Sequence, residues 1–216
     1  MRPQLLLRAK RPVAVGAMAI LAAGTSAVAL AQTQDAINVN QARTHVMAGR
    51  SVVVQGALRP ARQGAVVVLQ AQRGGAWRTL ARAGTDATGR YRLRYRAHRS
   101  GSWNARLRLA GPGADTSVRR TLGRLNIYRR AAASWYGPGF YGAHLACGGR
   151  LTPGTLGVAN KSLPCGSKVT LRYRGRTVRV PVIDRGPYVA GREYDLTSAT
   201  RERLGFRGHG YVLTTR

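Results

Sequence analysis

The sequence predicts an all-β protein made of two β domains behind an N-terminal export segment. Short runs of alternating apolar and polar residues recur from Arg50 onward, and glycine-containing turn signals separate them. Only residues 197–204 carry the start and stop signals of a helix. We expect a signal peptide over residues 1–31, a basic β-sandwich-like module with an N-terminal tether over residues 32–130, and a second β domain over residues 131–216.

The N-terminal segment has the order of a secretory signal. Basic residues come first, an apolar run follows over residues 13–30, and Ala29-Leu30-Ala31 has the form of a cleavage site. An uncleaved anchor is the alternative, because such a run is just long enough to cross a bilayer. We expect cleavage after Ala31, no stable membrane span afterwards, and a place in the cell envelope, periplasmic or wall-associated.

The chain is strongly basic, with 36 Lys+Arg against 7 Asp+Glu and a formal net charge of +29. Such a charge attracts polyanions, but export argues against nucleic acid and leaves anionic wall polymers as candidates. Residues 32–130 hold 19 Arg and 3 acidic residues, a net charge of +16. Either this module has a polyanion-binding face, or the charges are an ordinary solvated strand face.

The first domain is predicted from five patterned runs, which cover residues 51–58, 64–72, 77–83, 89–97 and 103–111. In the fourth run Tyr91, Leu93 and Tyr95 point to one side and arginines to the other, which is typical of a strand with one buried face. Five to seven such strands favour a small sandwich. The pattern GTDATGRYRLRY, residues 84–95, resembles immunoglobulin-like or transthyretin-like surface modules. Residues 32–46 lack this pattern and predict a tether.

The second domain follows an expected linker at residues 129–133. An aromatic, glycine-rich segment, residues 133–142, is either loop packing or a platform for sugar rings. Residues 168–173 and 177–184 predict a hairpin across Arg174-Gly175-Arg176. Thr197 is the expected cap of the helix, Gly205 its end, and residues 211–213 a closing strand.

Two cysteines, Cys147 and Cys165, predict one disulfide in an exported protein, with two unpaired thiols as the alternative. Two cysteines without paired histidines supply too few ligands for zinc. We therefore expect no metal and no cofactor.

Residues 178–197 are where we expect chemistry. Val178, Val180 and Val182 alternate along a strand that ends in Asp184 and the turn Arg185-Gly186-Pro187. Asp195 follows at the expected start of the helix. A rigid strand that delivers an acid into a loop is a common way to hold a catalytic group. The alternatives are a turn-capping role for Asp184 and a helix-start role for Asp195.

Three blocks, SWYGPGFYG, ANKSLPCGSKV and IDRGPYVAGREYDLT, resemble the rare lipoprotein A family over residues 133–214. The resemblance implies a six-stranded double-psi β-barrel that cleaves peptidoglycan glycan strands as a lytic transglycosylase. By position, Asp184 matches the essential acid of this family and Asp195 the acid of its DLS motif. The family usually has histidine where this chain has Asn160, and often glutamate where it has Gly149.

A lytic transglycosylase needs one carboxylic acid with a raised pKa, which serves as general acid and then as general base. We expect Asp184 in this role, Asp195 as a second catalytic group or as an orienting group, and His144 and His209 as solvated residues. An expansin-like protein that binds glycan without cleaving it is the alternative, and a partner of another wall enzyme is a third. The expected substrate-binding residues are Trp135, Tyr136, Asn160, Arg185 and Tyr188.

Overall fold

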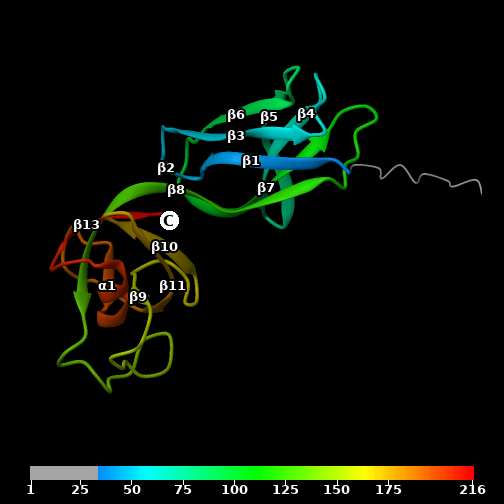
Figure 1. The fold of residues 1–216 in the computed structure, drawn as a ribbon. Coiled ribbons are helices and arrows are strands. Elements are labelled where there is room, and N and C mark those ends of the chain that lie inside the picture. Colours follow the sequence, from blue (N-terminus) through cyan, green and yellow to red (C-terminus); the bar gives the residue numbers. More distant parts are fainter. Residues whose placement is uncertain (1–33) are drawn as a thin grey trace, which may run out of the picture. The chain divides into compact units, whose positions relative to one another are not determined.

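The computed structural model describes residues 34–216, so the expected signal peptide lies outside the described residues. The described chain is all-β with one short helix (Figure 1). Its first strands are β1 (Ala36–Arg43), β2 (His45–Met47), β3 (Ser51–Arg59), β4 (Val66–Arg73), β5 (Ala76–Gly84), β6 (Arg90–Arg96) and β7 (Gly101–Ala110). The later elements are β8 (Arg119–Tyr136), β9 (Val158–Ala159), β10 (Lys168–Tyr173), β11 (Arg176–Asp184), β12 (Tyr194–Thr197), α1 (Ser198–Leu204) and β13 (Gly210–Thr214). The five runs predicted in the first domain correspond to β3 to β7.

Two sheets share the first apolar core. One has the order β1-β3-β6, and the other brings β5, β4, β7 and the first half of β8 side by side. Alternation places Val54 of β3 and Leu93 of β6 against Leu69 of β4 and Leu107 of β7, all of them buried. The alternation read from the sequence therefore describes the inner faces of both sheets.

The predicted tether is wrong for residues 36–43, which pair with β3 as strand β1. As an edge strand, β1 buries only Ile37 deeply, at 4% exposure, while most of its other side chains are exposed. An edge strand with one anchoring apolar residue has no clear period-two signal, so the sequence pattern does not reveal it.

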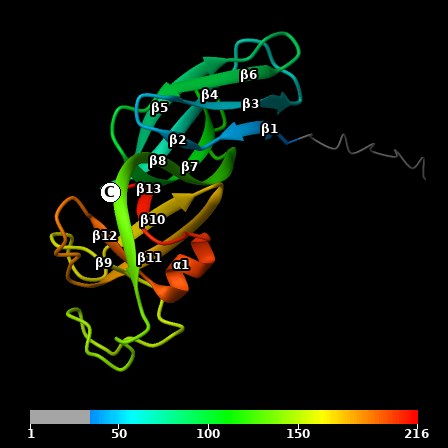
Figure 2. The same ribbon diagram turned by 90° about the vertical axis from the view of Figure 1, so that its left-hand side faces the viewer.

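The predicted linker at residues 129–133 is also wrong, because these residues lie inside the continuous 18-residue strand β8 (Figure 2). The first half of β8 pairs with β7, and its second half pairs with β13 and β12. Ala131 and Ala133 are buried in a second core, so small residues read as a linker are packed strand residues.

Six strands close a ring around this second core: β8 pairs with β13, β13 with β10, β10 with β11, β11 with β9, β9 with β12, and β12 with β8. The predicted hairpin is β10–β11 and the closing strand is β13. Thr197 caps α1 by accepting a hydrogen bond from the Thr200 amide, and Gly205 ends it in a left-handed conformation, as expected.

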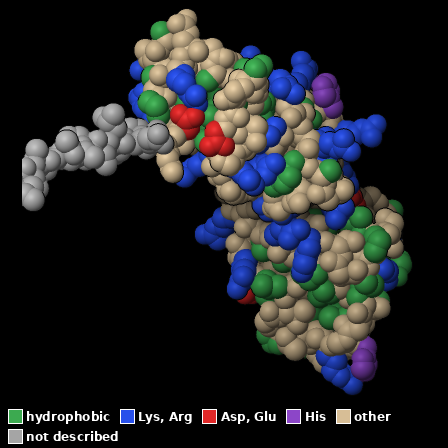
Figure 3. Space-filling model, turned by 90° about the vertical axis from the view of Figure 1, so that its right-hand side faces the viewer, with side chains coloured by type: hydrophobic (Ala, Val, Ile, Leu, Met, Phe, Trp, Pro, Cys, Tyr) green, Lys and Arg blue, Asp and Glu red, His purple; other side chains and the backbone are tan. Residues whose placement is uncertain are grey.

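Basic side chains greatly outnumber acidic ones over the face shown in Figure 3. The one helix among residues 34–216 falls well short of the length needed to cross a bilayer.

Candidate active site

Four neighbouring strands of the ring place Asp184, Ala159, Asp195 and Ser134 in one row. Asp184 of β11 is opposite Ala159 of β9, Ala159 is opposite Asp195 of β12, and Asp195 is opposite Ser134 of β8. Side chains in register on neighbouring strands project from the same face of a sheet. The row therefore brings two carboxyl groups to one face from strands that are separated by β9.

A β-bulge in β11 turns Asp184 onto this face. Val182 pairs with Val158 and both are buried in the ring core, but the register shifts before Asp184 pairs with Ala159. Without the extra residue, Asp184 would share the core-facing side of Val182. Asp195 lies between two buried core residues, Tyr194 and Leu196, so it also projects away from the core. The expectation that Asp195 starts the helix is wrong, because it lies in β12 and α1 begins at Ser198.

A cavity of about 200 Å³ lies over this face. Both aspartates, Tyr136 and Arg185 line it, together with residues of the loop that follows β8. A backbone hydrogen bond from Gly142 to Leu151 (2.8 Å) closes this loop on itself, and one from Cys147 to Ile183 (3.2 Å) holds it against β11. Four of the predicted site residues thus meet at one cavity, whose apolar lining comes from Phe140, Ala143, Leu145, Leu151 and Ala159.

Backbone amides orient Asp184. Its Oδ1 accepts hydrogen bonds from the Ala146 and Arg185 amides, each at 2.9 Å. The turn-capping role considered for Asp184 is therefore present in part, because one of the two amide donors, Arg185, belongs to the turn. Among the described residues no hydrogen bond of standard geometry reaches Oδ2, although the Tyr136 hydroxyl lies close to this carboxyl. One oxygen of Asp184 is thus committed to the fold, and the other can bind a ligand.

Asp195 has the perturbed carboxyl of the site. Burial raises its pKa and the neighbouring Asp184 charge acts in the same direction, while the Ser134 hydroxyl and the Arg192 charge oppose the shift. The Ser134 Oγ nevertheless makes no hydrogen bond of standard geometry, and Asp195 Oδ1 is buried without a partner among the described residues. A buried carboxyl with a raised pKa is a candidate proton donor.

Tyr136 lies close to both acids. Burial, the charges of Asp184 and Asp195, and a hydrogen bond to the Asp184 side chain raise the pKa of its phenol, which therefore keeps its proton. That hydrogen bond is not of standard geometry, so the Tyr136 hydroxyl, like Asp195 Oδ1, is buried without a standard hydrogen-bond partner among residues 34–216. Both residues line the cavity, which indicates a site that a ligand or water completes.

Three predicted binding residues do not line this cavity. Trp135 lies on the other side of β8, packs against the ring core and has the Arg201 guanidinium 4.0 Å above its ring. Asn160 is 4% exposed: its Nδ2 donates to the Glu193 carbonyl at 3.0 Å, and its Oδ1 accepts from the Ser162 and Leu163 amides. Tyr188 is 81% exposed in the loop after β11.

The predicted disulfide is confirmed. Cys147 and Cys165 are bonded, with their sulfurs 2.00 Å apart, and no free cysteine remains. The bond ties the cavity loop to the turn before β10. Arg185 extends this connection, because its guanidinium donates to the Asn160 and Leu163 carbonyls at 3.1 and 2.9 Å and to Cys165 Sγ at 3.2 Å.

The sequence analysis undervalued two residues. His144, expected to be a solvated loop residue, is exposed but lines the cavity with both aspartates. The available signal was its position just before Cys147, on the loop that the disulfide holds in place. Ser134 gave no signal at all, because only its pairing with Asp195 brings it to the site.

Comparison with known proteins agrees with this geometry. Residues 129–214 match the family described as lytic transglycolase. A protein of Synechocystis sp. named "Probable endolytic peptidoglycan transglycosylase RlpA" is 41% identical over 100 residues, which cover 41% of this chain and 31% of that protein. The protein of the same name from Aquifex aeolicus is 40% identical over 87 residues, covering 39% of this chain and 38% of the relative.

Residues 129–214 are thus similar to the rare lipoprotein A family. The chain spans about a third of the length of these two curated relatives. A solved structure, the Streptomyces papain inhibitor, is 26% identical, with 40% of this chain and 90% of that chain covered. Its TM-score of 0.33 is too low to support an argument.

Proposed function

We propose that the rare lipoprotein A domain binds peptidoglycan glycan strands and cleaves them as a lytic transglycosylase. The observation that carries the proposal is the cavity in which two carboxyl groups meet, one oriented by backbone amides and one with a raised pKa. The curated relatives described above are named for this activity. No metal ion or activated water is needed for it.

The two acids divide the proton transfers. Asp195, whose pKa is raised by burial, is the proton donor: it gives its proton to the glycosidic oxygen as the bond to the sugar breaks. The Asp184 carboxylate takes the proton from the sugar hydroxyl that attacks the same carbon and closes the anhydro ring. Solvent then returns a proton from Asp184 to Asp195, so the reaction has no net proton change.

This assignment departs from the one drawn from the sequence, which gave both steps to Asp184. The reason is that burial acts on Asp195, while Asp184 is held by two amide donors. Tyr136 and Arg185 line the cavity and are the proposed substrate contacts. Tyr188 has the exposed ring that could stack on a sugar beyond the cavity, whereas Trp135 and Asn160 act in the structure of the domain.

Binding without cleavage is the second candidate function, and one observation favours it. The histidine that the family usually has is replaced by Asn160, whose amide is fully engaged by backbone groups. Gly149, at the position of the family's glutamate, has no side chain and open space where a Cβ would lie. Neither position therefore supplies an ionisable group. An expansin-like protein, which binds glycan without cleaving it, needs none there.

Incubation of the protein with glycan strands free of stem peptides, followed by mass spectrometry, separates the two functions. Anhydro-muramyl products from wild type, absent with Asp195→Asn and with Asp184→Asn, support the transglycosylase. If products persist with Asp195→Asn but not with Asp184→Asn, then Asp184 carries out both proton transfers. Co-sedimentation with glycan but no products from wild type establishes the binding protein.

We also infer the wider architecture. The closed six-strand ring is proposed to be a double-psi β-barrel, and the two sheets before it an immunoglobulin-like or transthyretin-like sandwich, with the border near residue 131. An envelope location, periplasmic or wall-associated, follows from a peptidoglycan substrate. Fractionation of cells into envelope and cytoplasm tests it.

A further inference from the structure

We propose that the outer face of the β1-β3-β6 sheet binds a linear polyol phosphate laid along β6. Alternation sends Arg90, Arg92, Arg94 and Arg96 outward, while Tyr91 and Leu93 enter the core. Outward residues of a strand recur about every 6.6 Å, so the four guanidinium groups follow a row about 20 Å long. The proposal does not rest on the transglycosylase assignment, because none of these strands contributes to the cavity of the two aspartates.

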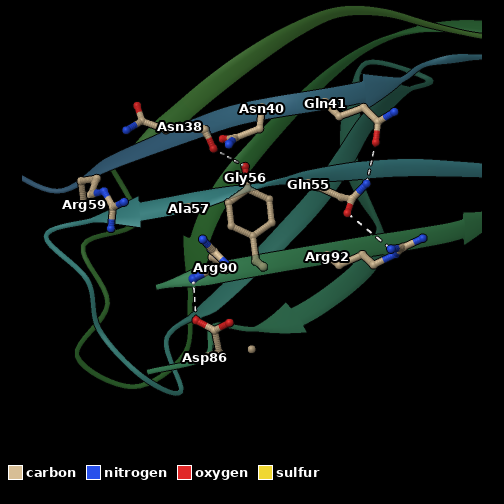
Figure 4. A pocket seen from close by; sticks show the side chains of 12 residues that line it. Asn38, Asn40, Gln41, Gln55, Gly56, Ala57, Arg59, Asp86, Arg90 and Arg92 are labelled. Atoms are coloured by element: carbon tan, nitrogen blue, oxygen red, sulfur yellow. Dashed lines mark hydrogen bonds between the residues drawn. The ribbon is translucent and has the colours of Figure 1, made fainter. Parts of the chain in front are cut away.

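Side-chain amides extend this row across the sheet. Gln41, Gln55 and Arg92 are opposite one another on the three strands. Gln55 Nε2 donates to Gln41 Oε1 at 2.6 Å, and the Arg92 guanidinium donates to Gln55 Oε1 at 3.4 Å (Figure 4). Asn38 and Asn40 add further amides at one end of the face. Guanidinium groups for anions thus stand beside amide groups that can bind hydroxyls.

Two hollows follow the face from end to end. The larger, of about 710 Å³, is lined by the row Gln41–Gln55–Arg92 and by Arg90 (Figure 4). The second, of about 570 Å³, is lined by the next row, Arg43–Val53–Arg94, and by Arg96. Because consecutive rows of one sheet line them, the two hollows are neighbours along β6, and together, as the groove, they are long enough for several charged repeats.

The arginines of β6 form no ion pair within residues 34–216, although the Asp86 charge lies near Arg90. The three ion pairs among residues 34–216 join Arg62 to Asp35, Arg129 to Glu193 and Arg201 to Glu202, and none includes an arginine of β6. The one carboxylate lining the groove, Asp86, accepts hydrogen bonds from the Thr88 hydroxyl and from the Thr88 and Arg90 amides. A bound polyanion would supply the missing negative charge.

The spacing and chemistry of the groove favour a polyol phosphate. A three-carbon polyol phosphate has six backbone bonds per repeat, as two residues of extended peptide do, so its charges recur at about 6.6–7 Å. Guanidinium groups match phosphate oxygens in pairs, and the amides match free hydroxyls. Single-stranded nucleic acid has a similar repeat but is held by bases stacked on aromatic rings. Of the aromatic residues of these three strands, Tyr91 lines the larger hollow but is only 4% exposed, and Tyr95 packs against the core, so neither presents an open ring face to a base.

The test is a titration of the purified full-length protein with poly(glycerol phosphate) at several NaCl concentrations. We expect Arg92→Gln/Arg94→Gln/Arg96→Gln to weaken binding at least about tenfold and to lower the slope of log affinity against log salt by about 2–3. The matched control, Arg78→Gln/Arg82→Gln/Arg119→Gln, removes the same charge from exposed positions outside the groove and should change affinity about twofold or less.

Several outcomes would overturn the proposal. Equal losses in the two triple variants would mean that overall charge, and not this groove, binds the polymer. Tighter binding of an oligo(dT) of equal charge would mark a nucleic-acid surface. Equal affinity for polygalacturonate, whose carboxylates sit on sugar rings, would remove the argument from spacing. No binding of poly(glycerol phosphate) even at low salt would end the proposal directly.

A second variant tests the groove without removing any arginine. Val53 is partly exposed on β3 and lies between Arg43 and Arg94 in register. Val53→Glu would pair with these arginines and neutralise the groove while leaving the fold intact, because opposite charges on adjacent strands are favourable. We expect it to weaken polymer binding at least about fivefold with an unchanged melting curve. Unchanged affinity in a folded Val53→Glu protein would contradict the proposal.

Discussion

At Asp184 and Asp195, the direction in which the side chain projects decides whether the residue lies in the core or at the cavity. Asp195 lies between the core residues Tyr194 and Leu196, and Asp184 lies two residues after the core residue Val182. Each reaches the cavity only because its side chain projects from the face opposite the core. For Asp195 ordinary alternation is enough, whereas Asp184 needs the bulge between Val182 and itself. Their environments then differ, since amides orient Asp184 and burial perturbs Asp195.

Replacing Asp195 should stabilise the protein at neutral pH. A carboxyl whose pKa is raised above its ordinary 3.8 binds its proton more tightly in the folded state. Folding stability is therefore lost as the pH rises from about 3.8 through the raised pKa, where the unfolded chain releases the proton first. We expect Asp195→Asn to melt at a higher temperature than wild type at pH 7.

Thermal unfolding of both proteins between pH 3 and pH 8 checks this prediction. The two melting curves should converge near and below pH 3.8, where Asp195 is protonated in both states. An Asp195→Asn protein that is less stable than wild type at pH 7 would show that the carboxylate is stabilised by its surroundings and is no proton donor.

His144 should contribute to substrate binding. It lines the cavity from the disulfide-tied loop and is open to solvent. Loss of one hydrogen bond to substrate corresponds to a rise in KM of about three- to tenfold for His144→Ala, with kcat little changed. His209→Ala, an exposed histidine away from the cavity, is the control and should match wild type. Equal KM values for both variants would exclude a substrate contact by His144.

Among the strands and loops, the contacts that matter most join segments far apart in the chain. The Tyr91 hydroxyl of β6 donates to the Asn38 carbonyl of β1 at 2.8 Å, passing over Gly56 of β3. The cavity loop similarly depends on β11, through the Ala146 amide, and on the disulfide. Each of these contacts joins two segments that are distant in the sequence, so a single substitution can break it.

Gly56→Ala should destabilise the β1-β3-β6 sheet. A Cβ at this position would lie 1.9 Å from the Asn38 carbonyl oxygen, a backbone atom that cannot move without breaking the strand pair. We expect a loss of about 2–4 kcal/mol in the free energy of unfolding, from the overpacking and the lost hydrogen bond. Gly84→Ala, where nothing lies within 4 Å of the new Cβ, is the control and should stay within about 0.5 kcal/mol of wild type by urea denaturation.

Removing the disulfide should loosen the cavity loop before it affects the rest of the chain. Cys147 and Cys165 are 18 residues apart, and closing such a loop stabilises by about 3 kcal/mol in the chain-entropy model. We expect Cys147→Ser/Cys165→Ser to melt at a lower temperature and to be cut by protease between residues 137 and 151. A variant that resists protease there as well as wild type does would show that backbone contacts alone hold the loop.

Over the whole described chain, β8 is the element common to both apolar cores. Its first half carries Leu125 and Ile127 into the first core, and its second half carries Ala131 and Ala133 into the ring core. The border between the two parts therefore falls inside a paired strand, with no flexible linker. Any division of the chain there removes strand pairing from one side.

A fragment that starts at residue 131 should accordingly be less stable than one that starts at residue 127. The shorter fragment loses the pairing of Arg129 and Arg130 with β13 and the ion pair of Arg129 with Glu193. Because that ion pair is partly exposed, we expect a difference of only about 1–2 kcal/mol in urea unfolding. Equal stabilities would place the border at residue 131 after all.

Features that depend on residues close together in the chain can be predicted from the sequence. Period-two alternation located β3 to β7 and the β10–β11 hairpin, and Thr197 and Gly205 bounded α1, because these signals act within a few residues. The scarcity of acids directed attention to Asp184 and Asp195, and two cysteines in a chain expected to be exported predicted the disulfide.

Only the three-dimensional structure shows which of these residues lie together at the cavity. Pairing register placed Ser134 beside Asp195, a bulge turned Asp184 out of the core, and loop closure brought His144 to the cavity. It also committed Asn160 to backbone amides and made a strand of the expected linker. The physical reason is range: alternation reports which face of a strand is apolar, whereas register and bulges depend on a partner strand that can lie 50 or more residues away.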